Sequence, residues 1–244
     1  MVPWSLIVAL GASFLSMPFF ALKGARRDRD ADQKGSRFLV GFGDFFLHWF
    51  LWVLRPVERA LLRVGATPDQ LNLAGLVFGV LSGVFVAQGY LEVGGWSMVG
   101  SGIADILDGR VARARGTTSA YGRFIDSTLD RFAEFFVLMG FVVFLRDRPW
   151  GVVFAAAALG GSLLVSYAQA RGEGVGAKRS GGLMQRAERV VLLCLACLSD
   201  SAVSAWMGEP RGQVVIGVLG FVALTSLGTA VYRTFLISRR LLKG

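Results

Sequence analysis

Apolar runs about as long as a membrane crossing recur throughout the chain. A hydrocarbon core about 30 Å thick needs about 20 largely apolar residues in a helix. Seven runs approach that length, at residues 2–22, 70–91, 93–114, 119–145, 150–170, 187–207 and 213–235. The pattern predicts an all-α integral membrane protein with a six-helix transmembrane core and one extra N-terminal transmembrane helix.

The segment between the first run and the core has a different character. Residues 23–37 are strongly charged and follow an apolar run, whereas the basic residues of a signal peptide precede it. Residues 1–37 therefore predict a membrane anchor and a charged linker. Residues 38–54 are apolar and aromatic, short for a crossing, and contain Asp44 and His48. We expect residues 38–66 to form an interfacial helix and residues 67–244 to form the core.

The composition agrees with a membrane location and indicates an orientation. Hydrophobic residues make up 54% of the 244 residues and charged residues 18%, and the mean hydropathy is +0.55. The net charge of +9 suggests basic loops beside anionic lipid rather than nucleic-acid binding. Arg146, Arg148 and Arg211 fall on one side of the alternating topology, and the other lysines and arginines lie on or toward the opposite side. The positive-inside rule predicts a multi-pass protein of the cell (inner) membrane, with the N-terminus outside and the C-terminus inside.

Four aspartates lie in two runs where an unpaired carboxylate is costly. Each costs about 2.5 to 3.5 kcal/mol at the centre of a membrane helix. Asp105 and Asp108 are three residues apart, and Asp126 and Asp130 are four apart, so each pair shares one helical face. A turn near residues 116–119 would bring both pairs to nearly the same depth. We expect the four carboxylates to converge in one polar cavity that faces the cytoplasm.

The residues of this stretch indicate which ligands the cavity takes. Oxygen donors without histidine or cysteine suit Mg²⁺, with Mn²⁺ or Ca²⁺ as alternatives, and disfavour zinc and copper. One ion or two would fit. Gly109, Ala112 and Gly122 are small and leave room for a ligand, and Arg113 offers a bidentate fork to phosphate. Together these features predict a pyrophosphate site.

The spacing of these residues matches a known signature. The pattern D-x-x-D-G-x-x-A-R-x8-G-x-x-x-D-x-x-x-D is met at every fixed position between Asp105 and Asp130. The stretch closely resembles the signature of the CDP-alcohol phosphotransferases, which are membrane enzymes of phospholipid synthesis. These enzymes move a phosphatidyl-type group from a CDP-linked lipid onto an alcohol and release CMP. The resemblance covers roughly residues 55–237 and extends to the family's six-helix core.

The resemblance implies a role for each residue of the signature. Asp105, Asp108 and Asp126 would hold a pair of divalent ions, usually Mg²⁺ or Mn²⁺. Asp130 would contact the second ion and deprotonate the acceptor hydroxyl. The nucleotide and its phosphates would lie on a floor of small residues beside an arginine, namely Gly109, Ala112, Gly122 and Arg113. The family resemblance also implies a homodimer.

Two further stretches resemble the phosphatidylinositol phosphate synthase branch of this family. Residues 61–75 are similar to its opening segment, in which Thr67, Pro68 and Asp69 would help to enclose the CDP-lipid, CDP-diacylglycerol. Residues 166–193 are similar to its second basic stretch, whose arginines would bind inositol phosphate. The matching residues are Arg171, Arg186 and Arg189. Gln185 and Ala187 depart from the glutamate and proline that are usual there.

Other interpretations of the same residues stay open. Arg171, Arg186 and Arg189, with Lys178 and Arg179, also fit an ordinary basic cytoplasmic loop. Residues 67–69 also fit a helix start, with a threonine N-cap and a proline in the first turn. The acceptor could instead be glycerol phosphate or another small alcohol. Buried aspartates also occur in ion and metal transporters.

Overall fold

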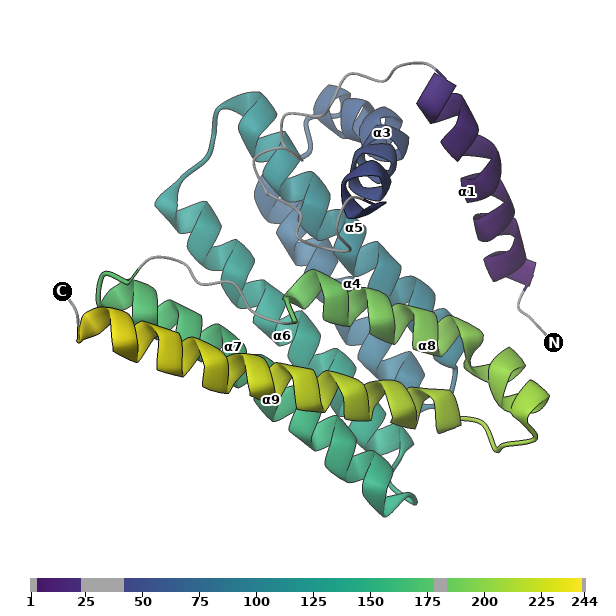
Figure 1. Ribbon diagram of the computed structural model, residues 1–244. Helices are drawn as coiled ribbons and strands as arrows, with labels where there is room; N and C mark the ends of the chain where they lie inside the picture. The colour runs from purple at the N-terminus through teal and green to yellow at the C-terminus, as the bar shows by residue number, and fades with distance from the viewer. Residues whose placement is uncertain (1–3, 23–41, 178–183, 243–244) are drawn as a thin grey trace.

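The described residues of the computed structural model are helical almost throughout. The structure describes residues 4–22, 42–177 and 184–242, and no strand occurs among them. The charged linker and the basic residues Lys178 and Arg179 lie outside the described residues. The helices are α1 (Trp4–Leu22), α3 (Phe42–Arg63), α4 (Pro68–Ala87), α5 (Leu91–Arg115), α6 (Ala120–Phe144), α7 (Pro149–Gly174), α8 (Arg186–Met207) and α9 (Gln213–Leu241), as Figure 1 shows. The predicted all-α class is confirmed.

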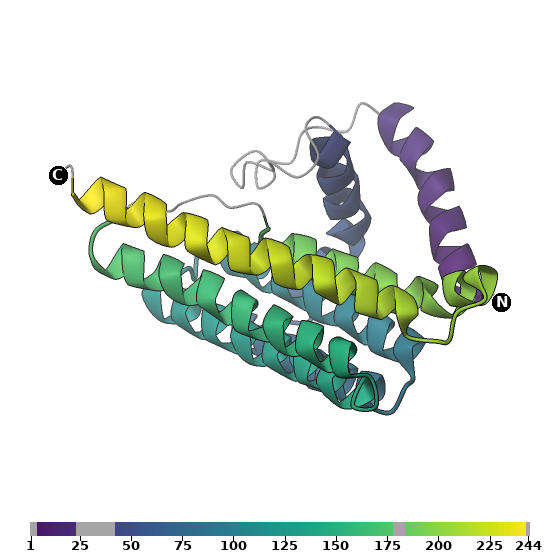
Figure 2. The same cartoon turned by 60° about the horizontal axis from the view of Figure 1, so that its bottom comes forward.

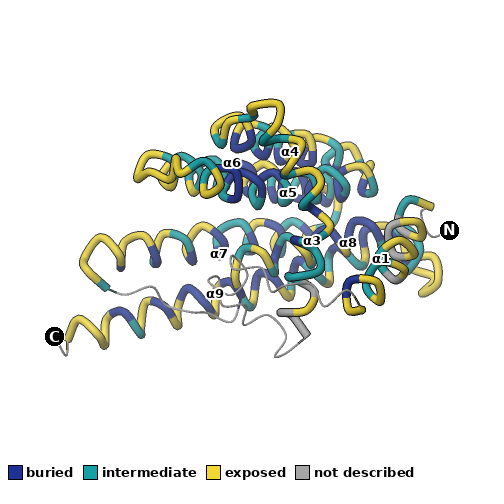
Figure 3. The backbone as a smooth tube through the Cα atoms, turned by 90° about the horizontal axis from the view of Figure 1, so that it is seen from above, coloured by how far each residue is buried: buried dark blue, intermediate teal, exposed yellow. Residues whose placement is uncertain are grey.

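The long helices α4 to α9 form two layers. In one layer α4 packs against both α5 and α6, and in the other α9 packs against both α7 and α8 (Figure 3). The layers meet where α5 packs on α8 and α6 packs on α7. Buried apolar side chains from all six helices fill the space between the layers, including Leu138 and Phe141 of α6 and Leu219 of α9. The first half of the core thus builds one layer and the second half builds the other.

Glycines allow α4 and α6 to approach each other closely. A Cβ atom added to Gly83 would lie 2.2 Å from the carbonyl oxygen of Phe136, and one added to Gly140 would lie 2.3 Å from the carbonyl oxygen of Gly83. No larger residue fits at either position without a shift of the backbone. Small residues at such crossings are the usual means of packing helices in membranes. This contact holds α6, the helix that carries Asp126 and Asp130, against α4.

The exposed surface and the length of the helices identify a membrane protein. Four helices of the described chain, α4, α7, α8 and α9, are long and apolar enough to cross a membrane. Large apolar side chains on α9 face outward, with Leu224 74% and Val231 70% exposed, as lipid contact requires. The helices α5 and α6 carry the charged signature residues and do not meet the same criterion. That all six helices cross the membrane stays a prediction.

Capping residues define where the core helices begin and end. The Thr67 hydroxyl accepts from the Gln70 backbone nitrogen, and the Gln70 side chain accepts from the Thr67 nitrogen. This capping box and Pro68 in the first turn confirm residues 67–69 as a helix start. The helix α5 ends at Gly116, whose φ of 66° is left-handed and favours glycine. The end of α5 lies within the signature stretch, and the start of α4 contains predicted nucleotide residues.

The N-terminal helices lie beside the two-layer bundle (Figure 2). The helix α3 runs from Phe42 through Pro56 to Arg63, within the interfacial segment expected at residues 38–66. Its Glu58 forms an ion pair of 2.7 Å with Arg110 of α5. The helix α1 reaches the start of α5, where the Trp96 indole nitrogen donates to the Ser5 hydroxyl over 3.0 Å. The two N-terminal helices therefore contact α5 toward opposite ends of that helix.

Candidate metal and substrate site

Three of the four predicted aspartates meet between α5 and α6. One carboxylate oxygen from each of Asp105, Asp126 and Asp130 lies within 4.8 Å of the other two, and all three residues are partly buried. The turn after Gly116 returns the chain, and the Ser119 hydroxyl caps α6 by accepting from the Gly122 nitrogen over 2.9 Å. Because the three side chains offer only oxygen donors, they fit a hard divalent cation such as Mg²⁺ or Mn²⁺.

Asp108 is placed differently from the other three aspartates. It lies one turn beyond Asp105 on α5, is 4% exposed, and is not a member of the group within 4.8 Å. The structure therefore brings together three of the four carboxylates that were expected to converge. Spacing alone does not distinguish residues three apart on one helical face, although they point about 60° apart around the helix. The role of Asp108 as a metal ligand stays a prediction.

Arg186 of α8 is in direct contact with the acidic cluster. Its Nη1 donates to Asp105 Oδ1 over 3.0 Å and to Asp130 Oδ2 over 2.5 Å. One guanidinium nitrogen thus bridges carboxylates from two helices of the other layer. The sequence indicated both the aspartates and this arginine, but it assigned them to different ligands. The structure places them at one point, where the positive charge offsets the repulsion between the carboxylates.

Arg189, the next predicted acceptor residue, lies deeper and has other partners. Its Nε and Nη2 donate to Glu134 Oε1 of α6 over 2.9 and 2.8 Å, and its Nη2 also donates to the Ser162 hydroxyl of α7 over 2.9 Å. Only 2% of its side chain is exposed. Arg131 adds a second positive charge 3.6 Å from Glu134 Oε2. The Arg189 guanidinium is therefore held by protein groups and does not lie with Arg186 on the acidic cluster.

Sequence reasoning missed Glu134, and a signal for it was present. Glu134 lies four residues after Asp130, on the same helical face, in the middle of an apolar stretch. A buried carboxylate in such a stretch requires a counter-ion, which Arg189 supplies. Ser162 had no comparable signal, because a single serine in a membrane helix is ordinary.

The predicted nucleotide residues lie at the same end of the bundle as the aspartates. Leu71, in the first turn of α4 after residues 67–69, packs with Leu107 and Val111 of α5 in a small core that also includes Leu54 of α3. The start of α4 therefore lies beside the signature stretch of α5. Thr67 and Asp69 are exposed there.

The small residues of the signature leave open surface. A Cβ added to Gly109 would meet only the guanidinium of Arg113, at 3.2 Å, and one added to Gly122 would meet only the Ser119 hydroxyl, at 3.3 Å. Arg113 is exposed and Ala112 is partly exposed. A ligand can therefore reach the backbone at these positions, as the predicted nucleotide site requires.

Arg171 is exposed in the last turn of α7. The structure records no bond from it to the aspartates, in contrast to Arg186 of the same predicted acceptor set. Its placement at a helix end leaves it accessible to an incoming anion.

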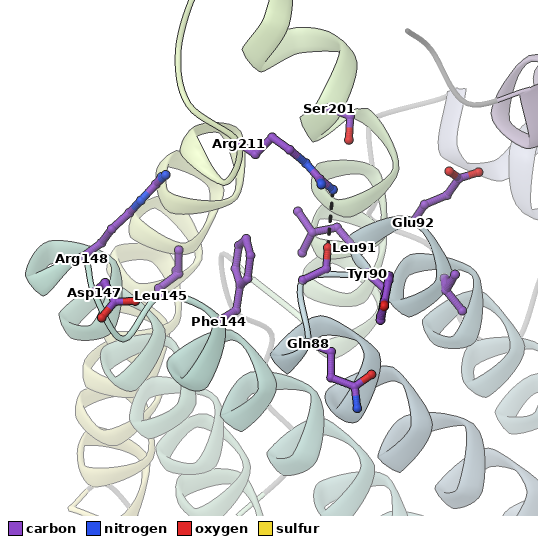
Figure 4. A pocket seen from close by; sticks show the side chains of 12 residues that line it. Gln88, Tyr90, Leu91, Glu92, Phe144, Leu145, Asp147, Arg148, Ser201 and Arg211 are labelled. Atoms are coloured by element: carbon purple, nitrogen blue, oxygen red, sulfur yellow. Dashed lines mark hydrogen bonds between the residues drawn. The ribbon is translucent and has the colours of Figure 1, made fainter.

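A cavity of about 680 Å³ lies at the other end of the bundle, away from these residues. It is formed where the chain turns between α4 and α5, between α6 and α7, and before α9. Figure 4 shows Phe144 and Arg211 at this cavity, where Arg211 Nη2 donates to the Gly89 carbonyl oxygen over 3.4 Å. None of the predicted site residues lines it. The candidate site is therefore defined by converging polar side chains and not by this cavity.

Known proteins share both the sequence and the fold of the chain. Residues 66–237 match the family model of CDP-alcohol phosphatidyltransferase. An archaetidylinositol phosphate synthase of Methanothermobacter thermautotrophicus is 30% identical over 175 residues, which cover 70% of this chain and 88% of the relative. A phosphatidylinositol phosphate synthase of Streptomyces avermitilis is 35% identical over 198 residues, which cover 78% and 80%.

Solved structures of one relative extend the similarity to three dimensions. The phosphatidylinositol phosphate synthase of Mycobacterium tuberculosis in complex with manganese and citrate matches with a TM-score of 0.65 and 30% identity, over 75% of this chain and 87% of that one. The same enzyme with CDP-DAG bound also matches with a TM-score of 0.65, over 75% and 92%.

The fold and the site together are those of an all-helical membrane protein with a cluster of carboxylates that offers oxygen ligands to a metal ion. The manganese complex of the relative and the acidic cluster of this chain both support the use of a divalent metal ion. The chain belongs to the CDP-alcohol phosphatidyltransferase family and is a transferase. Membership in this family argues against the interpretation of the protein as an ion or metal transporter.

Proposed function

We propose that the protein transfers the phosphatidyl group of CDP-diacylglycerol to inositol phosphate and releases CMP. The observation that carries the proposal is the contact of Arg186 with Asp105 and Asp130. A guanidinium, which suits a phosphate group, thereby lies beside the acids that would act on the acceptor hydroxyl. The relatives named as phosphatidylinositol phosphate synthases support inositol phosphate as the acceptor.

The reaction requires a base for the acceptor hydroxyl. The hydroxyl oxygen of inositol phosphate would attack the phosphorus that carries the diacylglycerol, the bond from that phosphorus to CMP would break, and Asp130 would take the hydroxyl proton. Asp130 suits this role because its carboxylate belongs to the cluster and is only partly buried. CMP would leave with the electron pair of the broken bond.

The metal ligands would be Asp105, Asp108, Asp126 and Asp130, and we propose two ions, Mg²⁺ or Mn²⁺. When bound, the ions would neutralise the pyrophosphate and polarise the hydroxyl. The convergence of three of these residues within 4.8 Å supports the assignment. Because Asp108 is buried, an ion would reach its carboxylate from one direction only.

The CDP-lipid would lie along the open surface of the signature. Arg113 would contact its phosphates, and the small residues would let the cytidine approach the backbone. The start of α4 would close this site from the side of α3. The proposed nucleotide residues are Thr67, Pro68, Asp69, Gly109, Ala112, Arg113 and Gly122.

The acceptor phosphate would be bound by Arg186 and by the accessible Arg171. Arg189 would act as a positioning residue, because its contacts with Glu134 and Ser162 hold the first turns of α8 against both layers. The distribution of lysine and arginine would place the site on the cytoplasmic side of the cell (inner) membrane. We also propose that the protein is a homodimer, which the resemblance to the family implies.

The test is CMP release by the purified protein with CDP-diacylglycerol and a panel of acceptors. Inositol phosphate should support turnover, whereas inositol without phosphate, serine and glycerol phosphate should support little. Asp126→Asn serves as the inactive control for background hydrolysis. Preference for glycerol phosphate or for an unphosphorylated alcohol would overturn the acceptor assignment, and no CMP release with any acceptor would overturn the reaction.

A further inference from the structure

Arg186 uses the same carboxylates that a divalent cation would need. Its Nη1 is bonded to two of the three aspartates in the acidic cluster, on α5 and on α6. The side chains of Arg186, Asp105 and Asp130 remain 19 to 29% exposed, so the contact is open to solutes. A guanidinium and a divalent cation repel each other strongly at contact distance. Even two unit charges repel each other by about 4 kcal/mol at 4 Å with an effective dielectric constant of about 20.

We infer that Arg186 and a divalent cation exchange on Asp105 and Asp130, and that the acceptor's phosphate receives the displaced guanidinium. The inference rests on the proposed function, which supplies the cation and the acceptor. Arg186 would then be more than a binding residue for the acceptor. It would couple the two binding events, since each ligand favours the same position of one side chain.

The surroundings of Arg186 confine the exchange to its side chain. Before α8, the Met184 nitrogen donates to the Thr229 hydroxyl of α9 over 3.1 Å. The Gln185 nitrogen donates to Glu188 Oε2 over 2.8 Å in the capping box of α8. One turn later, Arg189 is fixed by its buried pair with Glu134. The backbone is therefore held on both sides of Arg186, whereas its long side chain can rotate.

When a cation displaces the Arg186 guanidinium from Asp105 and Asp130, the guanidinium needs another partner. Its Nε is enclosed and has no hydrogen-bond partner among the described residues, so the group already has an unused donor. A phosphate dianion offers several acceptor oxygens in the geometry that suits an arginine fork. Linkage requires reciprocity: if the acceptor raises the affinity for the cation, the cation raises the affinity for the acceptor by the same factor.

Binding of Mn²⁺ to the detergent-purified protein tests the exchange without any turnover. Free Mn²⁺ would be measured by electron paramagnetic resonance in titrations of the wild type, Arg186→Gln and Arg239→Gln. Arg239 is an exposed arginine near the end of α9 and controls for the loss of one positive charge. Arg186→Gln should bind Mn²⁺ at least about tenfold more tightly, which corresponds to about 1.4 kcal/mol, and Arg239→Gln should match the wild type.

Addition of inositol phosphate to the same titrations tests the coupling. The acceptor should raise the Mn²⁺ affinity of the wild type severalfold and that of Arg186→Gln much less. Arg186→Lys keeps the charge without the fork and should show a smaller coupling than the wild type. Asp126→Asn should weaken Mn²⁺ binding, which shows that the titrated site is the cluster.

The outcomes separate this inference from the proposed function. Equal Mn²⁺ affinity of the wild type and Arg186→Gln would overturn the exchange, even if the enzyme turns over inositol phosphate. An equal effect of inositol phosphate on both proteins would overturn the coupling. Tighter Mn²⁺ binding by Arg186→Gln, with no effect of inositol phosphate on either protein, would support the exchange and overturn the coupling, and the turnover with the acceptor panel would still test the proposed acceptor.

Discussion

Two arginines three residues apart on α8 show how burial separates a structural ion pair from an exchangeable one. Arg189 and its partner Glu134 are 2% and 6% exposed, and the Ser162 hydroxyl also accepts from the Arg189 guanidinium. Arg186 and its partner Asp105 are 21% and 29% exposed. Both arginines cross from α8 to the other layer, and both contact a carboxylate at 3.0 Å or less.

The difference lies in what could replace each arginine. Removal of one partner from a fully buried pair leaves a charge that neither water nor an ion can reach, so each partner is needed as long as the other is present. In a partly exposed pair, solute ions or a ligand can replace one partner, and such a pair therefore suits a binding site. The environment, and not the residue type, thus distinguishes the two positions.

The largest effect should come from Asp130→Asn. Loss of the proposed base should reduce CMP release by at least about 100-fold. The unfolding temperature in detergent should stay near that of the wild type, because the asparagine still accepts a hydrogen bond from Arg186. Asp147→Asn, at an exposed acid at the other end of the bundle, is the matched control and should keep full activity. Wild-type rates in Asp130→Asn would contradict the role of this residue.

Glu134→Ala should destabilise the fold by about 3 to 5 kcal/mol, because it leaves Arg189 buried without its carboxylate. Thermal unfolding followed by circular dichroism in detergent measures the change. The double variant Glu134→Leu with Arg189→Met should regain most of the lost stability, since no buried charge remains. If the single variant unfolds like the wild type, the pair is not structural.

Removal of one partner from an ion pair of intermediate burial should cause an intermediate loss of stability. Arg110 and Glu58, which join α5 to α3, are 8% and 15% exposed. Arg110→Gln should lower the stability by about 2 kcal/mol, the usual size for a hydrogen bond to a charged group. Limited proteolysis should also cut α3 faster in this variant. A loss as large as that in Glu134→Ala would show that burial does not rank these pairs.

Arg186→Glu should act selectively on the binding of the acceptor. The acceptor KM should rise about tenfold or more, because a fork to phosphate becomes a like charge, whereas the KM for CDP-diacylglycerol should change little. Arg239→Glu controls for the change in net charge. A similar rise in both KM values would place Arg186 in the nucleotide site instead.

Much of the fold and part of the site could be predicted from the sequence. The apolar runs predicted the helices α4 to α9, because helix length and hydrophobicity are local properties. The helix α3 continues from the apolar stretch at 38–54 through Pro56 to Arg63, within the segment expected at residues 38–66. Proline is often a boundary, but the contacts of Leu54 and Glu58 with the core extend the helix past it.

Spacing along the chain determined the candidate chemistry. The signature fixes which residues share a helical face, because a helix repeats every 3.6 residues, so the carboxylate pairs of α5 and α6 could be read from their positions. The same spacing could not decide which members of each pair converge. Asp105, Asp126 and Asp130 meet, whereas Asp108 lies apart from their group.

Only the tertiary structure decided the partners of the two arginines. Arg186 bonds to Asp105 across 81 positions of sequence, and Arg189 bonds to Glu134 across 55. Such pairs depend on how the two layers pack, which follows from close contacts such as those of Gly83 and Gly140 and not from helical periodicity. The sequence by itself determined that acids and arginines lie near one end of a helical bundle. The packing decided which arginine is buried and which remains open to a ligand, because burial depends on the neighbours that each helix meets.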